Sequence, residues 1–190
     1  GSDITSGDYL IVYESGGVAF NGGLESLDTS SNMISVSISN NTISYSSVTE
    51  AAKFSINQVD GGYTICSSSG KYIYGTSGSN ILNTSGSAQI NTISISDGNA
   101  DIVSNTSHLR YNSDSNQTRF RYFKSSSYTS QKAIQLYKAC YSSSSSPTVN
   151  EVMVSPSLLS LDVYSNPTST LVASVSGTNS PSQSVTWTSL

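Results

Sequence analysis

The most constraining feature of this sequence is a short pattern that occurs three times, in residues 9–21, 63–75 and 100–112. Each copy contains two apolar alternations separated by a polar turn, and the three copies align without a gap. A unit this small cannot bury its own apolar face, so the copies must pack against one another. The repeats therefore predict an all-β module with pseudo-threefold symmetry. The aligned positions include Ile11 with Ile65 and Ile102, Val18 with Tyr72 and Leu109, and Phe20 with Tyr74 and Tyr111.

Each unit also ends in a two-residue alternation, in residues 54–56, 93–95 and 134–136, which is typical of a half-buried strand. Asp60-Gly61 and Asp97-Gly98 follow the first two of these segments. Such pairs predict tight hairpins, because Asp and Gly tolerate the positive φ that the turn needs. Alternation further predicts that the tyrosines of the second strands fill the core. No segment predicts a helix.

Three units of about four short strands, each with an opening, a second and a closing strand of this kind, resemble a β-trefoil over about residues 7–138. The motifs are a Tyr-x-Ile opening, a Gly-Lys-Tyr-Ile-Tyr-like second strand and a Phe-x-Ile closing strand. The resemblance implies a six-stranded barrel capped by three hairpins. The Gln-x-Trp signature of the ricin-type lectin branch is missing, so lectin activity does not carry over with the fold. A two-sheet sandwich built from the same strands is the alternative.

Composition divides the chain near residue 141. All four prolines follow residue 146, whereas every Lys and Arg lies at or before Lys138. The serine run 142–146, followed by Pro147, has the composition of a flexible tether. We therefore expect a first domain at residues 1–140, a linker at 141–147 and a second domain at 148–190.

The last part of the chain contains four apolar segments in sequence, at residues 152–156, 159–161, 170–175 and 184–187. In this order they resemble the opening strands of bacterial group 2 immunoglobulin-like domains. The resemblance implies the first half of a β-sandwich, from a protein that is secreted or displayed on the bacterial surface. A half sandwich leaves its core open, at a cost of about 25 cal/mol for each Å² of apolar surface. We therefore expect this segment to pack on a second copy or on the first domain.

Charge and residue counts argue against several classes of function. A net charge of −4 disfavours general nucleic-acid binding, which depends on an excess of Lys and Arg. No apolar stretch approaches the length of a membrane span. One histidine and two distant cysteines are too few for a structural zinc site, and we expect no metal or cofactor. Whether Cys66 and Cys140 form a disulfide stays open.

The third repeat holds six of the eight basic residues together with His108, the only histidine. Along residues 119–124, alternation turns Phe120 and Tyr122 inward and the intervening residues outward. An outward aromatic ring between two guanidinium groups can stack on a sugar and pair with an anionic group. The alternative is a solvated sheet face whose charges prevent strands from associating at their edges. The predicted ligand-binding residues are Arg110, Arg119, Arg121, Phe123 and His108.

These features favour a noncatalytic carbohydrate-binding or adhesion module of a larger secreted or cell-surface bacterial protein. Its partner would be an anionic or neutral glycan. Catalysis is disfavoured because His108 lies at the outward-facing start of a strand, where a solvated imidazole is the simpler interpretation. The alternative function is a purely structural spacer, or a protein–protein interaction module without a glycan site.

Overall fold

The computed structural model describes residues 4–140, 148–161, 164–165, 168–178 and 181–188. The chain forms two compact units, Gly1–Ala139 and Cys140–Leu190, and we describe each one separately. The predicted linker at 141–147 lies outside the described residues.

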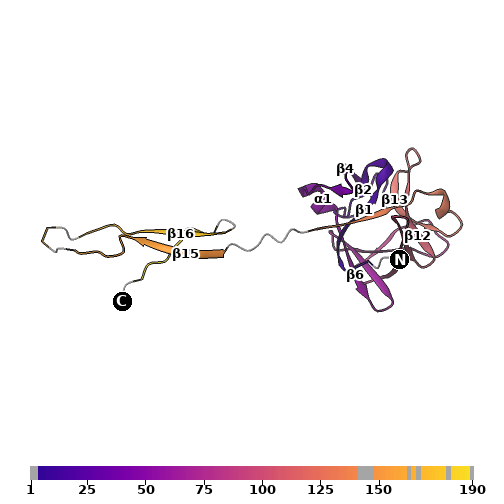
Figure 1. Ribbon diagram of the computed structural model, residues 1–190. Coiled ribbons are helices and arrows are strands. Elements are labelled where there is room, and N and C mark those ends of the chain that lie inside the picture. Colours follow the sequence, from indigo (N-terminus) through magenta and orange to yellow (C-terminus); the bar gives the residue numbers. More distant parts are fainter. Residues whose placement is uncertain (1–3, 141–147, 162–163, 166–167, 179–180, 189–190) are drawn as a thin grey trace. The chain divides into compact units, whose positions relative to one another are not determined.

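The first unit consists mainly of short strands (Figure 1). In chain order its elements are β1 (Gly7–Tyr13), η1 (Glu14–Gly16), β2 (Val18–Phe20), β3 (Met33–Ser35), β4 (Ile38–Ser39), β5 (Thr42–Ile43), α1 (Ser47–Ala52), β6 (Phe54–Val59), β7 (Gly62–Ser67), β8 (Tyr72–Tyr74), β9 (Asn83–Ser85), β10 (Ile90–Ser96), β11 (Asn99–Ser104), β12 (Ser107–Asn112), β13 (Arg119–Lys124), η2 (Tyr128–Ser130) and β14 (Gln135–Lys138).

Six of these strands close into a ring. β1 pairs with both β14 and β6, β6 pairs with β7, β7 pairs with β10, and β10 pairs with β11. An antiparallel bridge between Ala100 of β11 and Ile134, the residue before β14, completes the circle. A closed sheet leaves no unpaired edge along the ring. The first unit is therefore an all-β barrel of the β-trefoil-like kind, not a two-sheet sandwich.

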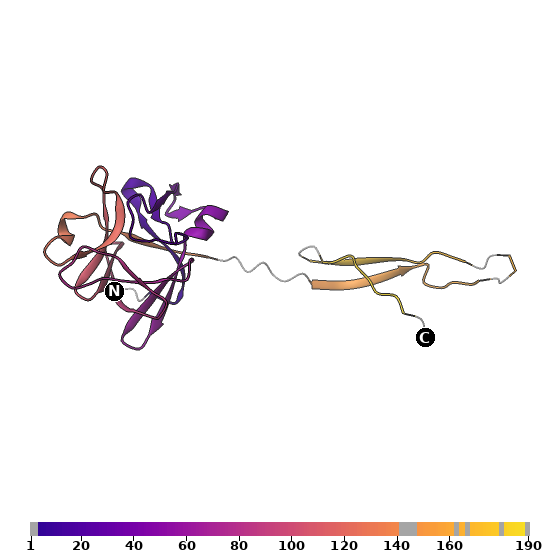
Figure 2. The ribbon, with the colours of Figure 1, turned by 180° about the vertical axis from the view of Figure 1, so that it is seen from behind.

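Each repeat has one strand pair outside this ring, and Figure 2 shows the unit from behind. These pairs are β2–β3, β8–β9 and β12–β13, and the first repeat also contains the short pair β4–β5. The isoleucines of the repeats occupy corresponding registers in the ring and all three are fully buried. The pseudo-threefold symmetry of the three units stays a prediction. The registers are Ile11 opposite Leu136, Ile65 opposite Ile56 and Ile102 opposite Ile93.

The gap-free alignment of the second strands is wrong. The turn that precedes the second strand becomes one residue shorter from the first unit to the second, and again from the second to the third. In the third unit it is the two-residue turn Asn105-Thr106, with φ values of 48° and 64°. This shortening is visible in the pairings, which are Val12 with Ala19, Cys66 with Tyr72 and Val103 with His108.

The shifted register changes which second-strand residues are buried. Ile73 is fully buried, and its neighbours Tyr72 and Tyr74 are half-buried, so the prediction that these tyrosines fill the barrel is wrong. The corresponding buried positions of the other units are Phe20 and Leu109. One residue of slip reverses the face of every side chain along a strand, because the period of a strand is two.

The second closing strand is also shifted from its predicted position. Tyr63 of the second unit pairs with Asn91, just as Tyr9 of the first unit pairs with Phe54. The equivalent of Phe54 in the second closing strand is therefore residue 91, and not residue 93 as predicted. Asn91 is only 1% exposed, and its amide donates to the Ile73 carbonyl and accepts from the Tyr122 hydroxyl. These bonds satisfy a polar side chain at a position where sequence alternation leads one to expect an apolar residue.

Two further expectations concern local structure. The hairpins at Asp60-Gly61 and Asp97-Gly98 are confirmed, because Val59 pairs with Gly62 and Ser96 with Asn99. The helix α1 was not predicted. It begins after Ser46, whose hydroxyl accepts the backbone N–H of Thr49 at 3.1 Å in a capping box.

The second unit contains two described strands, β15 (Thr148–Ser155) and β16 (Val172–Thr178), which pair antiparallel. Val152 lies opposite Val175 and Val154 opposite Ala173, so these side chains share one face of the sheet. Many of its apolar side chains are solvent-exposed, including Val152 at 52% and Trp187 at 53%. The immunoglobulin-like fold of this unit stays a prediction. Among the described residues, no helix has the length and apolar character needed to cross a membrane.

Candidate functional site on the outer face of β10–β13

The five predicted ligand-binding residues lie on one face of the β12–β13 hairpin. Antiparallel partners share a face, and side chains alternate between faces along each strand. The register places His108 opposite Phe123 and Arg110 opposite Arg121, with Arg119 two residues further along β13. The strand assignment behind the site prediction is therefore correct, although the side chains differ in what they contact.

Phe123 is not the exposed aromatic platform that the sequence predicts. Its side chain is only 5% exposed. The short helix η2 packs against both β12 and β13 at this end of the hairpin. Its first residue, Tyr128, stacks on the His108 ring with a centroid separation of 3.6 Å and an interplanar angle of 9°. Phe123 is therefore buried, and this part of the site prediction is wrong.

The two outer arginines of β13 are held by other residues of the chain. The Nε and Nη2 groups of Arg121 donate to the two carboxylate oxygens of Asp28, at 2.6 and 3.0 Å. Arg119 donates to the side-chain and backbone oxygens of Gln117. A bidentate Arg–carboxylate pair uses the same geometry that an anionic ligand would need. The prediction that Arg121 pairs with an anion is therefore not supported by its contacts.

The remaining predicted residues, Arg110 and His108, meet at Asp101. Nη2 of Arg110 and Nδ1 of His108 lie 2.8 and 2.9 Å from the same oxygen, Oδ1. Because an ionised carboxylate only accepts hydrogen bonds, Nδ1 of His108 is the donor in this contact. The second oxygen, Oδ2, has no hydrogen-bond partner among the residues that the structure describes.

The exposure of this group differs strongly from member to member. The Asp101 side chain is 38% exposed, whereas Arg110 and His108 are 11% and 16% exposed. Nη1 of Arg110 also donates to the carbonyl oxygens of Ala100 and Leu109, which fixes the guanidinium plane. Two largely buried donors thus hold one oxygen of a carboxylate whose other oxygen remains available.

An open pocket of about 290 Å³ lies beside Asp101. The paired strands β10 and β11 form most of its wall, because Ser94 lies opposite Asp101 and Ser96 opposite Asn99. These wall residues carry hydroxyl, amide, carboxylate and guanidinium groups, which can donate and accept hydrogen bonds at close spacing. The lining residues are Ser94, Ser96, Asp97, Asn99, Ala100, Asp101, Arg110 and Ala133.

A chain of hydrogen bonds holds Asn99, one of the residues of the pocket wall. The backbone N–H of Glu14 donates to Oε1 of Gln135 at 3.0 Å, and Nε2 of Gln135 donates to Oδ1 of Asn99 at 2.7 Å. The Glu14 side chain accepts the hydroxyl of Tyr137 at 2.8 Å. Burial and this nearby carboxylate raise the pKa of Tyr137 to about 12.

Sequence reasoning missed the pocket residues and also Asp28. The segment 97–101 was recognised only as a hairpin turn. A signal was present, because polar residues 94, 96, 99 and 101 have the parity of one outward face on two paired strands. Asp28 gives no comparable signal, since it lies 93 residues from its partner.

Among the residues that the structure describes, no group of three His, Cys, Asp or Glu side chains is arranged to hold a metal ion. Cys66 is a free thiol, and burial raises its pKa.

Comparison with known proteins gives distant structural likenesses and no match of sequence. No protein-family model matches the chain, and no curated protein matches it. Among solved structures it is similar to a ricin B-like lectin of Macrolepiota procera in complex with lactose, with 16% identity and a TM-score of 0.45. The alignment covers 74% of this chain and 92% of that lectin. The assignment of the barrel above rests on the strand pairing of this chain.

Proposed function

We propose that the first unit is a noncatalytic carbohydrate-binding module and that its site lies on the outer face of β10–β13. The observation that carries this proposal is the open pocket beside Asp101, where one carboxylate oxygen is clamped by Arg110 and His108 and the other has no described partner. A carboxylate held in this way accepts hydrogen bonds from hydroxyl groups without having to be ordered on binding.

The chemistry of the pocket supports a ligand rich in hydroxyl groups. A sugar hydroxyl both donates and accepts, and it needs partners of both kinds at short spacing. Ser94 and Ser96 can do both, Asp97 and Asp101 accept, and Arg110 donates. Binding sites of this kind use a small number of well-placed polar groups to fix the orientation of the ligand.

The surroundings of His108 favour binding over catalysis. Its Nδ1 is directed at Asp101 and its ring is stacked on Tyr128. In the described part of the chain no serine hydroxyl is hydrogen-bonded to this ring, as nucleophilic catalysis by a triad would require. We therefore propose a role in attachment or targeting within a larger secreted or cell-surface bacterial protein, with the second unit as an immunoglobulin-like spacer.

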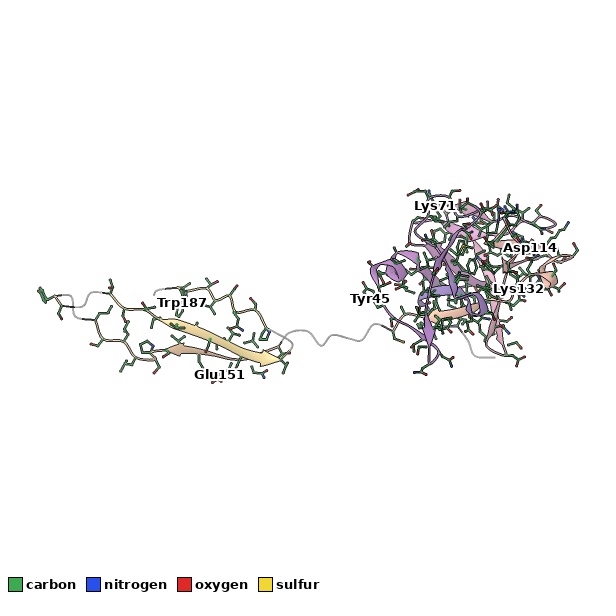
Figure 3. The ribbon with its side chains drawn as sticks, turned by 90° about the horizontal axis from the view of Figure 1, so that it is seen from above. Tyr45, Lys71, Asp114, Lys132, Glu151 and Trp187 are labelled. Atoms are coloured by element: carbon green, nitrogen blue, oxygen red, sulfur yellow. The ribbon has the colours of Figure 1, made fainter. Side chains whose placement is uncertain are left out.

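A glycan array tests the proposed function. The full chain is applied to immobilised neutral, uronic-acid and sulfated oligosaccharides, beside Arg110→Ala and a matched control, Lys71→Ala. Lys71 (Figure 3) lies between β7 and β8 of the second repeat and is not among the residues that line the pocket. We expect wild type and Lys71→Ala to bind the same glycans and Arg110→Ala to lose them. A folded wild-type protein that binds no glycan would contradict the proposal.

A second candidate function, a structural or protein-interaction module, is favoured by the exposed apolar residues of the second unit. Val152 and Trp187 are each more than half exposed, and such clusters mark association surfaces. If this unit self-associates, the molar mass in light scattering rises with concentration, and Val152→Ser combined with Trp187→Ser abolishes the rise. A concentration-independent monomer would contradict this second candidate.

A further inference from the structure

We infer that the pocket beside Asp101 selects an uncharged saccharide, and that Gln135, which does not line the pocket, is the positioning residue for its donor side. This inference rests on the proposed function and specifies its ligand. Three features of the described residues carry it: the charge of the wall, the unused oxygen of Asp101 and the orientation of two side-chain amides.

The charge of the wall opposes an anionic ligand. The lining contains two carboxylates, Asp97 and Asp101, and one guanidinium, Arg110, which is already paired with Asp101. The next arginine on this face, Arg121, has both carboxylate oxygens of Asp28 as its partners. A sulfate or uronate entering the pocket would meet an unpaired negative charge on Asp97 and no unpaired positive charge in the wall, and like charges repel at short range.

The acceptor side of the pocket is set by Asp101. Its Oδ1 accepts from both Arg110 and His108, so the plane of the carboxylate is fixed. Asp101 lines the pocket, and the lone pairs of its Oδ2 are unused by any described residue. A hydroxyl group of the ligand can donate to this oxygen, and hydrogen bonds to a charged acceptor are stronger than those between neutral groups.

The donor side of the pocket is set by an amide relay that starts at the backbone of Glu14. A backbone N–H can only donate, so the atom of Gln135 that faces Glu14 must be the oxygen. The Gln135 NH₂ group therefore faces Asn99, and the Asn99 oxygen accepts from it. The Asn99 NH₂ group then donates one hydrogen to the backbone carbonyl of Asp97 at 3.5 Å, which leaves its second hydrogen for a ligand in the pocket that Asn99 lines. Gln135 thus determines that Asn99 offers a donor to the ligand.

The experiment compares uncharged oligosaccharides with matched uronic-acid, sulfated and amino-sugar counterparts, all titrated onto the full chain. The variants are Asp101→Asn, with Asp114→Asn as control, and Gln135→Glu, with Gln58→Glu as control. Asp114 follows β12 in an exposed loop (Figure 3), and Gln58 is exposed on β6. Each pair makes the same chemical change, inside or outside the proposed site. Unfolding midpoints establish that every variant is folded.

We expect wild type to prefer the uncharged glycans, with an affinity that does not change with salt concentration. Asp101→Asn lowers this affinity by about tenfold or more, because a charged acceptor and the clamp on it are lost together. Gln135→Glu also lowers it by about tenfold, because the new carboxylate cannot donate to Asn99, whose amide then turns and offers its oxygen to the ligand. That reversal leaves amino-sugar binding less affected, which a purely structural role of Gln135 would not produce.

The possible results separate this inference from the proposed function. A preference for sulfated or uronic-acid glycans that weakens in high salt would overturn the inference and leave carbohydrate binding intact. Uncharged glycans that bind Asp101→Asn and Gln135→Glu as well as wild type would move the site elsewhere and also overturn it. Equal losses for all sugar classes in Gln135→Glu would refute the positioning role. Absence of binding to every glycan would refute the proposed function itself.

Discussion

Two arginine–carboxylate pairs meet side by side on the outer face of the β12–β13 hairpin, and they leave very different hydrogen-bonding groups available. Arg110 and Arg121 are directly opposite each other on β12 and β13. Arg121 occupies both oxygens of Asp28, which is 19% exposed, whereas Arg110 and His108 share a single oxygen of Asp101, which is 38% exposed. We call these the closed pair and the open pair.

The comparison teaches that the number of charges on a surface does not measure its capacity to bind. Both pairs contain an arginine and an aspartate. From the sequence, Arg121 is the stronger candidate for ligand binding, because aromatic residues flank it. Binding capacity depends on donors and acceptors that remain unused after the chain has satisfied its own groups. The open pair keeps one such acceptor beside a pocket, and the closed pair keeps none.

The largest expected effect tests whether Phe123, which shares a face with the open pair, is part of the core. Phe123 lies opposite His108 and is 5% exposed, so Phe123→Ala should lower the free energy of unfolding by about 3 kcal/mol. Denaturant unfolding measures this loss, and Phe123→Leu serves as a control with a smaller loss. A change within the error of the method would mean that Phe123 is exposed after all, as the sequence predicts.

The next largest effect separates the open pair from the closed pair directly. Asp101→Asn should reduce glycan affinity about tenfold or more, whereas Asp28→Asn should leave the affinity within about twofold of wild type. Asp28→Asn should instead lower the free energy of unfolding by about 1 kcal/mol, because a bidentate, partly buried pair is lost. Calorimetry and denaturant unfolding on both variants measure the two quantities. Equal effects on binding would remove the distinction.

A smaller effect concerns the support behind the open pair, and it depends on pH. The pKa of Tyr137 is raised to about 12 from the 10.0 of a free tyrosine, so the folded state holds the phenol proton more tightly than the unfolded state. The stabilisation is fully present below pH 10 and is lost as the pH rises towards 12. The free energy of unfolding, measured across this pH range, should decline less steeply with pH in Tyr137→Phe than in wild type. Identical slopes would argue against the Glu14 contact.

The smallest expected effect concerns Arg119, at the far end of the same face. Its guanidinium contacts only Gln117, in an exposed position. Arg119→Ala should therefore change the free energy of unfolding by less than about 0.5 kcal/mol and leave glycan affinity unchanged. A clear loss of affinity would extend the site beyond the open pair and restore the original prediction for this residue.

The fold could be predicted further than the site. Alternation and Asp-Gly pairs identified the ring strands and two of their hairpins, because these signals depend on neighbours a few residues apart. Relative to the first unit, the second strand was placed one residue off in register in the second unit and two residues off in the third, because the length of a turn cannot be inferred from apolar parity alone. Residues 108, 110, 119, 121 and 123 were placed on the correct hairpin face, yet the sequence could not show which of them were already engaged.

By itself, therefore, the sequence determined an all-β first unit, the turns that connect its strands and the strand parity that brings Arg110 to the outer face. Only the tertiary structure decided that Phe123 is covered, that Arg121 is closed by Asp28 and that Asp101 keeps one oxygen available. The physical reason is the range of the interactions. A strand is specified by residues two apart in the sequence. The hydrogen-bond partners that decide whether a polar group is already engaged are much further apart, with a separation of 93 residues for Arg121 and Asp28 and of 36 for Gln135 and Asn99.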